Sequence, residues 1–240
     1  NPSSGSANGT QFDKAIIAYK ALLNAHLNNQ PELLEALGRK ESVVTAIQQL
    51  NTYLAQYNSL NQTNQSNQDA VVADIKKKTT SLVASLPKTI VVTQSYSTAL
   101  ASQVTDITDD VVLPDQHSSA AKDILAAFQN TVTIEGKAQY FIMTLFDGTK
   151  KEGTLITKTV SSPRGNAYLV EIIPSTLATN AQAIQFAEEP EIVKSSQPVI
   201  ARWLHSTLSD TSISYVLLGD LVASLEDLTT LVIRSTLPSP

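Results

Sequence analysis

The sequence predicts an α+β fold that is mostly α-helical, with an antiparallel helical bundle and a small antiparallel β-meander of three or four strands. In the first and last parts of the chain, apolar residues recur at steps of three and four, as they do on one face of a helix. Between residues 131 and 173 the hydrophobicity alternates instead, and turn residues separate the runs, which is typical of antiparallel strands.

Three helices are predicted before residue 60. The first covers residues 11–27, and its apolar face consists of Phe12, Ile16, Tyr19, Leu23 and Leu27. A short helix begins at Pro31 and ends at Gly38, because Pro suits a first helical turn and Gly suits a C-cap. The third helix starts at Lys40, and its apolar steps of four and three predict that it packs along another helix.

The run NQTNQSNQD at residues 61–69 contains no apolar side chain. One interpretation is a single long helix, because the apolar register resumes beyond the run. We favour a hairpin loop at Asn61–Asn67. In a continuous helix the packing face would be polar at this point and would bury no apolar surface, whereas a bend lets the two flanking helices pack their apolar faces against each other. The fourth helix then covers residues 69–86 and ends before Pro87.

Residues 88–112 are predicted to form a further helix. The stretch TIVVTQSY has the composition of a strand. Helical steps nevertheless separate Leu100, Val104, Ile107 and Val111. Pro114 ends this segment, and the next helix begins at an N-cap that is either Asp115 or Ser118.

The alternating segment that begins at Thr131 predicts the meander. Its strand sequences are TVTIEG with AQYFIMTLF, then GTLITKTV, then AYLVEII, and its turns are DGTKKEG and SSPRGN. Because YFIMTLF is apolar on both faces, we expect a central strand that helices cover. A sheet of this size is marginally stable alone, so it should dock on the helical part.

Helices are predicted again after Pro174. The first covers residues 175–188, the second starts at Ser196, and the last starts at Asp210 or Thr211. The last of these has Leu217, Leu221, Leu225, Leu228 and Val232 at helical steps.

The predicted elements divide the chain into a flexible N-terminal spacer at 1–10, a helical bundle domain at 11–130, and a β-meander followed by C-terminal helices at 131–240. The first ten residues, NPSSGSANGT, are small and polar, like a spacer that follows a removed signal segment. They predict a secreted, periplasmic or cell-surface protein, with a lipid tether as one candidate.

The composition argues against several classes of partner. The net charge is −5 and the sequence pI is about 5.2, so the chain lacks the positive field that binds nucleic acid. There is no Cys, which leaves no disulfide and no thiolate metal site. No apolar run approaches the roughly 20 residues that cross a bilayer, so no membrane span is predicted.

Residues suited to catalysis are few. The sequence has three His, and it lacks the nucleophile-elbow, P-loop and dinucleotide-binding motifs. His26 lies on the apolar stripe of the first helix and His205 follows Trp203, so both are interpreted as structural. Asp115 and His117 are close enough to share a cation, but helix caps explain such acidic residues without a metal. We therefore predict that the protein is not an enzyme and holds no cofactor.

These observations favour a non-catalytic interaction or scaffold protein outside the cytoplasm. Its partner would be a protein, bound through helical faces or through the hairpin at residues 147–153. The exposed tip of that hairpin consists of Asp147, Gly148, Lys150 and Lys151.

Two alternatives remain. The first is a carrier of a lipid or another small apolar ligand in a cavity of the helical bundle, because five Phe and one Trp supply few large rings to fill a core. The second is a metal-dependent enzyme centred on Asp115 and His117, since hard cations favour oxygen ligands.

Overall fold

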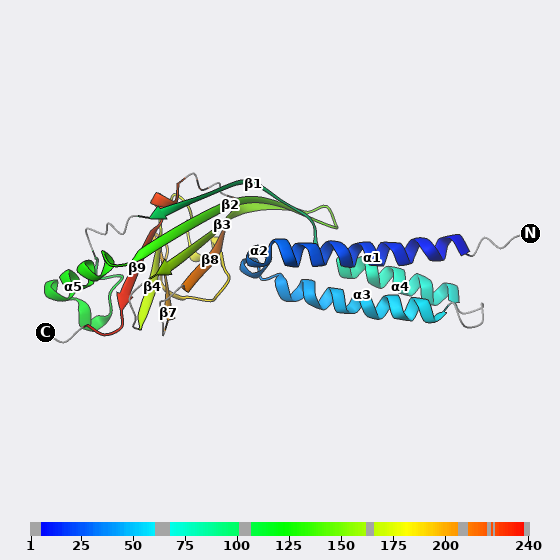
Figure 1. The fold of residues 1–240 in the computed structure, drawn as a ribbon, viewed down its shortest axis with the longest axis horizontal. Helices are drawn as coiled ribbons and strands as arrows, with labels where there is room; N and C mark the ends of the chain where they lie inside the picture. Colours follow the sequence, from blue (N-terminus) through cyan, green and yellow to red (C-terminus); the bar gives the residue numbers. More distant parts are fainter. Residues whose placement is uncertain are drawn as a thin grey trace, which may run out of the picture. The chain divides into compact units, whose positions relative to one another are not determined.

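The computed structural model describes residues 6–60, 68–100, 107–161, 166–205, 211–219, 222 and 224–237. Its helices are α1 (Ser6–Asn29), α2 (Pro31–Ala36), α3 (Lys40–Leu60), α4 (Gln68–Val83) and α5 (Ser119–Gln129) (Figure 1). Its strands are β1 (Pro87–Leu100), β2 (Thr133–Leu145), β3 (Lys150–Ser161), β4 (Ala167–Ile173), β5 (Ile184–Phe186), β6 (Glu191–Ser195), β7 (Val199–His205), β8 (Thr211–Leu218) and β9 (Thr229–Arg234). Short 3-10 turns are η2 (Pro114–Gln116), η3 (Ala181–Ala183) and η4 (Leu225–Asp227).

The strands form two antiparallel sheets, so the mostly helical fold class predicted from the sequence is wrong. The first sheet has the strand order β1-β2-β3-β8-β5, and the second has the order β6-β7-β4-β9. The protein is therefore not a helical bundle with a small meander. Among the described residues it is a sheet-rich fold that also carries helices.

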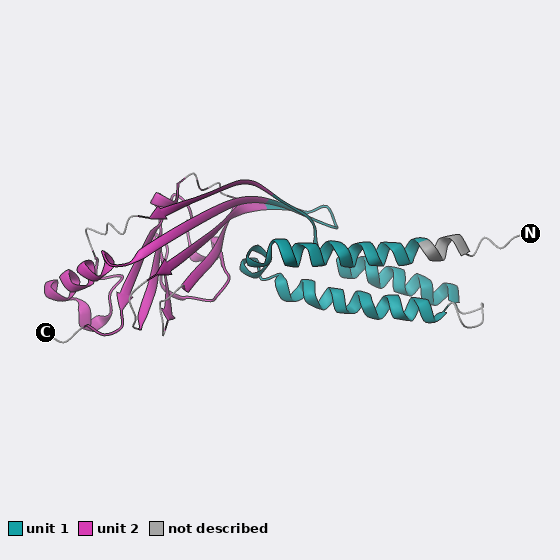
Figure 2. Cartoon of the chain, viewed as in Figure 1, with its two compact units in different colours: residues 1–91, 142–151 teal, residues 92–141, 152–240 magenta. Residues whose placement is uncertain are grey.

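The chain forms two compact units, which Figure 2 shows in different colours. Unit 1 contains residues 1–91 and 142–151, and unit 2 contains residues 92–141 and 152–240. The division falls inside β1, β2 and β3. The domain boundary predicted from the sequence, at residue 130, lies within unit 2.

Unit 1 is built on α1, α3 and α4, whose apolar stripes meet in one core. The fully buried members of this core include Ile16, Leu23, Leu34, Val43 and Leu50. Ile16 and Leu23 lie at the steps of three and four that predicted the first helix, and the helices predicted from residue 11 to residue 86 are confirmed in type. Gly38 has a φ of +61°, as a C-cap requires. The predicted loop at Asn61–Asn67 lies outside the described residues.

Unit 2 is a β-sandwich, because two of its core clusters each contain residues from both sheets. In one cluster Ile156 of β3 and Tyr215 of β8 pack with Ile173 of β4 and Val199 of β7. The helix α5 covers the opposite face of the second sheet, where Leu125 is fully buried. The second sheet is therefore buried on both faces, as in a three-layer arrangement.

Several helices predicted from the sequence are strands in the structure. Residues 87–100 are strand β1 rather than helix, and the three helices predicted after Pro174 are replaced by strands β5 to β9. The third strand of the predicted meander, β4, pairs with β7 and β9 in the second sheet. The helix after Pro114 is confirmed as α5, and its N-cap is Ser118, whose hydroxyl accepts a hydrogen bond from the N–H of Ala121.

Within the described residues, no helix is both long enough and apolar enough to cross a bilayer. The helix α1 begins at Ser6, inside the segment that was predicted to be a spacer.

Candidate functional site

Three of the four sheet edges in unit 2 are protected against pairing with another strand. The edge strand β5 is only three residues long. The edge strand β6 carries the charged residues Glu191 and Lys194 and has an irregular register between Ile192 and Lys194. Short strands, charges and bulges are the devices that natural sheets use to block further pairing at an edge.

The third protected edge, β9, is occupied by two glutamine side chains. Gln129 of α5 accepts a hydrogen bond of 2.7 Å from the N–H of Val232. Gln116 of η2 donates a hydrogen bond of 2.8 Å to the carbonyl oxygen of Arg234. Both glutamines are buried, so the layer that covers the second sheet also satisfies backbone groups along its edge.

The fourth edge, β1, is 14 residues long, and its one charged residue is Lys88 near its start. Within unit 2 it covers Val92–Leu100, a segment that contains no charged residue and no Pro. Thr93, Gln94, Ser95, Ser97, Thr98 and Ala99 are all exposed. We call this segment the open edge. Among the described strands its neighbour in the sheet is β2 alone, so within the described residues its other side presents unpaired backbone donors and acceptors.

Two side chains hold the open edge against the sandwich core. The Tyr96 hydroxyl donates a hydrogen bond of 2.6 Å to the carbonyl oxygen of Val222. Leu100 packs over Gly136 of β2, where an added Cβ would lie 3.1 Å from a methyl group of Leu100 and 2.9 Å from one of Leu225. The open edge is therefore anchored on its inner face and available along its outer side.

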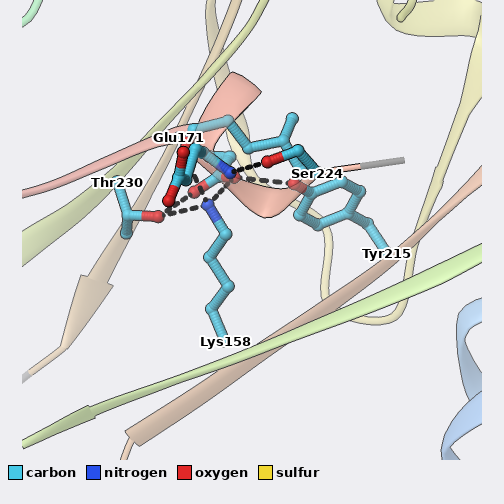
Figure 3. Close-up of polar contacts among 7 residues, drawn as sticks. Lys158, Glu171, Tyr215, Ser224 and Thr230 are labelled. Carbon is cyan, nitrogen blue, oxygen red and sulfur yellow. Dashed lines mark hydrogen bonds and ion pairs between the residues drawn. The ribbon is translucent and has the colours of Figure 1, made fainter. Parts of the chain in front are cut away.

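A second feature of unit 2 is a buried polar cluster that lies between the two sheets (Figure 3). Its members are Lys158 of β3, Tyr215 of β8, Glu171 of β4 and Thr230 of β9. Lys158 and Glu171 are both 0% exposed. Among the described residues, they are the only buried Lys and the only buried Glu.

Strand register brings these four side chains together. On β3, Ile156, Lys158 and Val160 are buried at alternate positions, and this spacing places their side chains on one face. On the second sheet Glu171 lies directly opposite Thr230, since β4 and β9 pair in that register. The cluster therefore occupies positions that would otherwise hold apolar residues of the sandwich core.

The contacts within the buried polar cluster are short. Nζ of Lys158 lies 2.6 Å from Oε1 of Glu171 and donates hydrogen bonds to the Thr230 hydroxyl at 2.6 Å and the Leu228 carbonyl oxygen at 3.3 Å. The Thr230 hydroxyl in turn donates to Oε2 of Glu171 at 2.6 Å. The Tyr215 hydroxyl donates to Oε1 of Glu171, also at 2.6 Å.

Burial determines both the desolvation cost of the Lys158–Glu171 ion pair and the pKa of Tyr215. Removing a carboxylate and an ammonium from water costs several kcal/mol per ion, and the pair offsets this only with good geometry and further hydrogen bonds. Burial, followed by the nearby charge of Glu171, raises the pKa of Tyr215 well above its usual value of 10.0. The phenol therefore stays protonated and remains a hydrogen-bond donor to the carboxylate.

The residues predicted at the hairpin tip lie between β2 and β3 in unit 1. Gly148 has a φ of +90°, and the Asp147 carboxylate accepts a hydrogen bond of 2.8 Å from the N–H of Thr149. That hydrogen bond is the main reason why the pKa of Asp147 is lowered. Lys150 is exposed and Lys151 is half-buried.

The hairpin tip is attached to the helical unit and is not free. The N–H groups of Phe146 and Asp147 donate to the carbonyl oxygens of Leu86 and Ala84, at 3.1 and 2.9 Å. The Phe146 ring packs edge-on against Tyr19 of α1, with 5.1 Å between ring centroids. The tip therefore completes the core of unit 1 and offers only its charged outer side to a partner.

Asp115 and His117 are both exposed, at η2 and at its C-terminal end. The neighbouring Asp109 forms an ion pair of 2.6 Å with Lys122, which lowers the pKa of Asp109. In the part of the chain that the structure describes, no three His, Asp or Glu side chains are placed to hold a metal ion. The metal-dependent alternative therefore gains no support from this geometry.

The other two His residues are not brought together. His26 is buried at the end of α1, with Nε2 3.4 Å from the carbonyl oxygen of Lys88. Burial lowers the pKa of His26 more than this hydrogen bond raises it. His205 is half-buried at the end of β7.

The carrier alternative needs a cavity in the helical part. Unit 1 has an open groove lined by Tyr53, Asp74, Lys77, Lys78, Ser81 and Leu82. An ion pair of 2.6 Å between Asp74 and Lys78 lies along α4 at this groove. The groove is open to solvent, whereas sites for small apolar ligands are enclosed, so this groove does not favour the carrier alternative.

Neither the open edge nor the buried polar cluster was identified from the sequence. The signal for the cluster was Glu171, a single charge inside the apolar strand sequence AYLVEII. The signal for the open edge was the strand-like stretch TIVVTQSY, which was assigned to a helix.

No protein-family model, no curated protein and no solved structure matches the chain. The function of the chain is therefore inferred from its own geometry.

Proposed function

We propose that the protein is a non-catalytic scaffold that self-associates by pairing its open edge with the open edge of a second copy. The observation that supports this most is the contrast among the four edges of unit 2. Three are shortened, charged or covered, whereas in the described part of the chain Val92–Leu100 is neither short, nor charged, nor covered by another element. An edge that is left unprotected beside three protected ones is suited to strand addition.

The occupant that fits this edge best is an identical strand. Antiparallel pairing of two copies is isologous, so each residue that contacts its counterpart is contacted in return. The absence of charge from Thr89 to Leu100 means that such pairing places no like charges opposite one another. Threonine, valine and tyrosine in this segment are residues that favour strands. Binding of a different protein through helical faces or the hairpin tip remains a prediction, as does the extracytoplasmic location.

The test is sedimentation velocity of the purified chain over a range of concentrations. The wild type should form a dimer. Ser95→Lys combined with Ser97→Lys should yield a monomer, since the antiparallel pair would bring four lysines together near its centre. The matched control is Ala120→Lys with Ala127→Lys, which adds the same charge at exposed positions of α5 and should leave the dimer intact.

Two results would overturn the proposal. One is a wild-type chain that stays monomeric at every concentration. The other is a dimer that survives the lysine pair in the open edge, because association would then use a different surface.

A further inference from the structure

Within the buried polar cluster the Lys158 amine and the Tyr215 and Thr230 hydroxyl groups each lie 2.6 Å from an oxygen of the Glu171 carboxylate (Figure 3). We propose that Lys158 and Glu171 condense to an amide bond that joins the two sheets covalently. This inference is independent of the open edge, because it concerns only the interior of the sandwich.

The positions of the hydroxyl groups define a role for each. Thr230 lies between the reacting groups, since its hydroxyl accepts from Nζ of Lys158 and donates to Oε2 of Glu171, both at 2.6 Å. It is therefore placed to relay protons from the amine to Oε2. The Tyr215 hydroxyl donates to the other oxygen, Oε1, and is placed to stabilise negative charge that develops there.

The reaction starts from the ion pair and needs no co-reactant. One proton passes from Nζ through the Thr230 hydroxyl to Oε2, which leaves a neutral amine and a neutral carboxylic acid. The amine lone pair then forms a bond to Cδ of Glu171, and the electrons of the Cδ–Oε1 double bond move onto Oε1. A second proton follows the same route from the nitrogen to Oε2. The electron pair on Oε1 then re-forms the Cδ–Oε1 double bond as the Cδ–Oε2 bond breaks, and Oε2 leaves as water.

Burial favours this outcome in two ways. The neutral amine and acid are less disfavoured than separate ions in a medium of low polarity, so the proton transfer costs less there than in water. The product is a neutral amide, which removes the desolvation cost of two buried charges. The remaining N–H of the amide can still donate to the carbonyl oxygen of Leu228.

Intact mass spectrometry of the denatured, purified chain tests the proposal directly. The expected mass is that of the sequence less one water molecule. Proteolysis should then release a branched peptide in which the segment that contains Lys158 is joined to the segment that contains Glu171, and fragmentation should locate the branch at these two residues.

Three variants sharpen the test. Lys158→Arg keeps the positive charge but offers a poor nucleophile, so the full mass is expected. Thr230→Val is similar in shape but removes the proton relay, so most of the chain should keep the full mass. Lys194→Arg makes the same exchange at a surface position and should still show the loss of one water molecule.

A wild-type chain at the full sequence mass would overturn the proposal and leave an ordinary buried ion pair. Loss of water that persists in Lys158→Arg would also overturn it, because the dehydration would then lie elsewhere, such as at Asp147 before Gly148. The wild-type mass decides the question even where a variant fails to fold.

Discussion

Lys158 and Glu171 lie in different sheets of the sandwich, and Nζ of one is 2.6 Å from Oε1 of the other with both side chains fully buried. A slip of one residue in either strand would turn one charge to the other face of its sheet and leave the other charge in the core without a partner. The pair therefore specifies how the strands of the two sheets are registered against each other.

Lys158→Met should destabilise the fold strongly, because it leaves the Glu171 carboxylate buried without a cation. Relative to the double variant Lys158→Met with Glu171→Leu, we expect a loss of about 3–5 kcal/mol in the free energy of unfolding. Denaturant unfolding of both variants measures this difference. Equal stabilities would show that the uncompensated charge is not what destabilises the single variant.

Gly153→Ala should be much more destabilising than Gly136→Ala. A Cβ on Gly153 would lie 2.5 Å from the backbone oxygen of Leu217, in the strand that pairs with β3, so the sheet itself must move. A Cβ on Gly136 meets only the ends of leucine side chains. Overpacking typically costs about 1–3 kcal/mol, and we place Gly153→Ala at the upper end. Thermal unfolding should rank the two variants in this order, and the reverse order would contradict the description of the β3–β8 pairing.

Stability should fall as the pH drops below the usual His pKa of 6.5, because burial lowers the pKa of His26 in the folded chain. Between the folded and unfolded pKa values the unfolded chain binds a proton that the folded chain does not, so the free energy of unfolding decreases with decreasing pH. His26→Gln should remove this part of the pH dependence. The exposed His117→Gln is the control and should retain it. Unfolding curves at a series of pH values test this, and a His26→Gln profile that matches the wild type would refute it.

Phe146→Ala should destabilise unit 1 by about 2 kcal/mol, below the range for a fully buried Phe because this ring is half-buried. The ring packs against Tyr19 and anchors the hairpin tip to the helices. Lys150→Ala, at an exposed position four residues further on, should change the stability by less than about 0.5 kcal/mol. Similar effects of the two changes on denaturant unfolding would mean that the tip is not anchored by its aromatic ring.

The early helices were predictable because their apolar residues face one core from one side. Ile16 and Leu23 of α1, like Val43 and Leu50 of α3, are fully buried while residues between them are exposed. This one-sided burial produces the spacing of three and four that identifies a helix.

The later strands were not predictable in the same way because many are buried on both faces. On β4, Leu169, Val170 and Ile173 are all fully buried, since one face packs on the first sheet and the other on the layer that contains α5. Alternation is lost in such a strand, and a continuous apolar run does not distinguish a strand from a buried helix.

The leucine steps near the C-terminus were misleading for a different reason. Leu217 belongs to β8, Leu225 to η4 and Val232 to β9. The regular spacing therefore arose by coincidence among residues of three separate elements, not from one helix. The β-branched residues of these segments were the better indicator. The open edge and the buried polar cluster depend on sheet order and on pairing across sheets, which local spacing does not encode.

Hydrogen–deuterium exchange of the amides from Val92 to Leu100, at low and high protein concentration, tests the proposed function most directly. Pairing of two open edges would give hydrogen-bond partners to the amides that point away from β2, at alternate positions along the strand. We expect these amides to exchange more slowly as the concentration rises, while those of β3 do not change. Exchange that is equally fast at all concentrations along the open edge would contradict it.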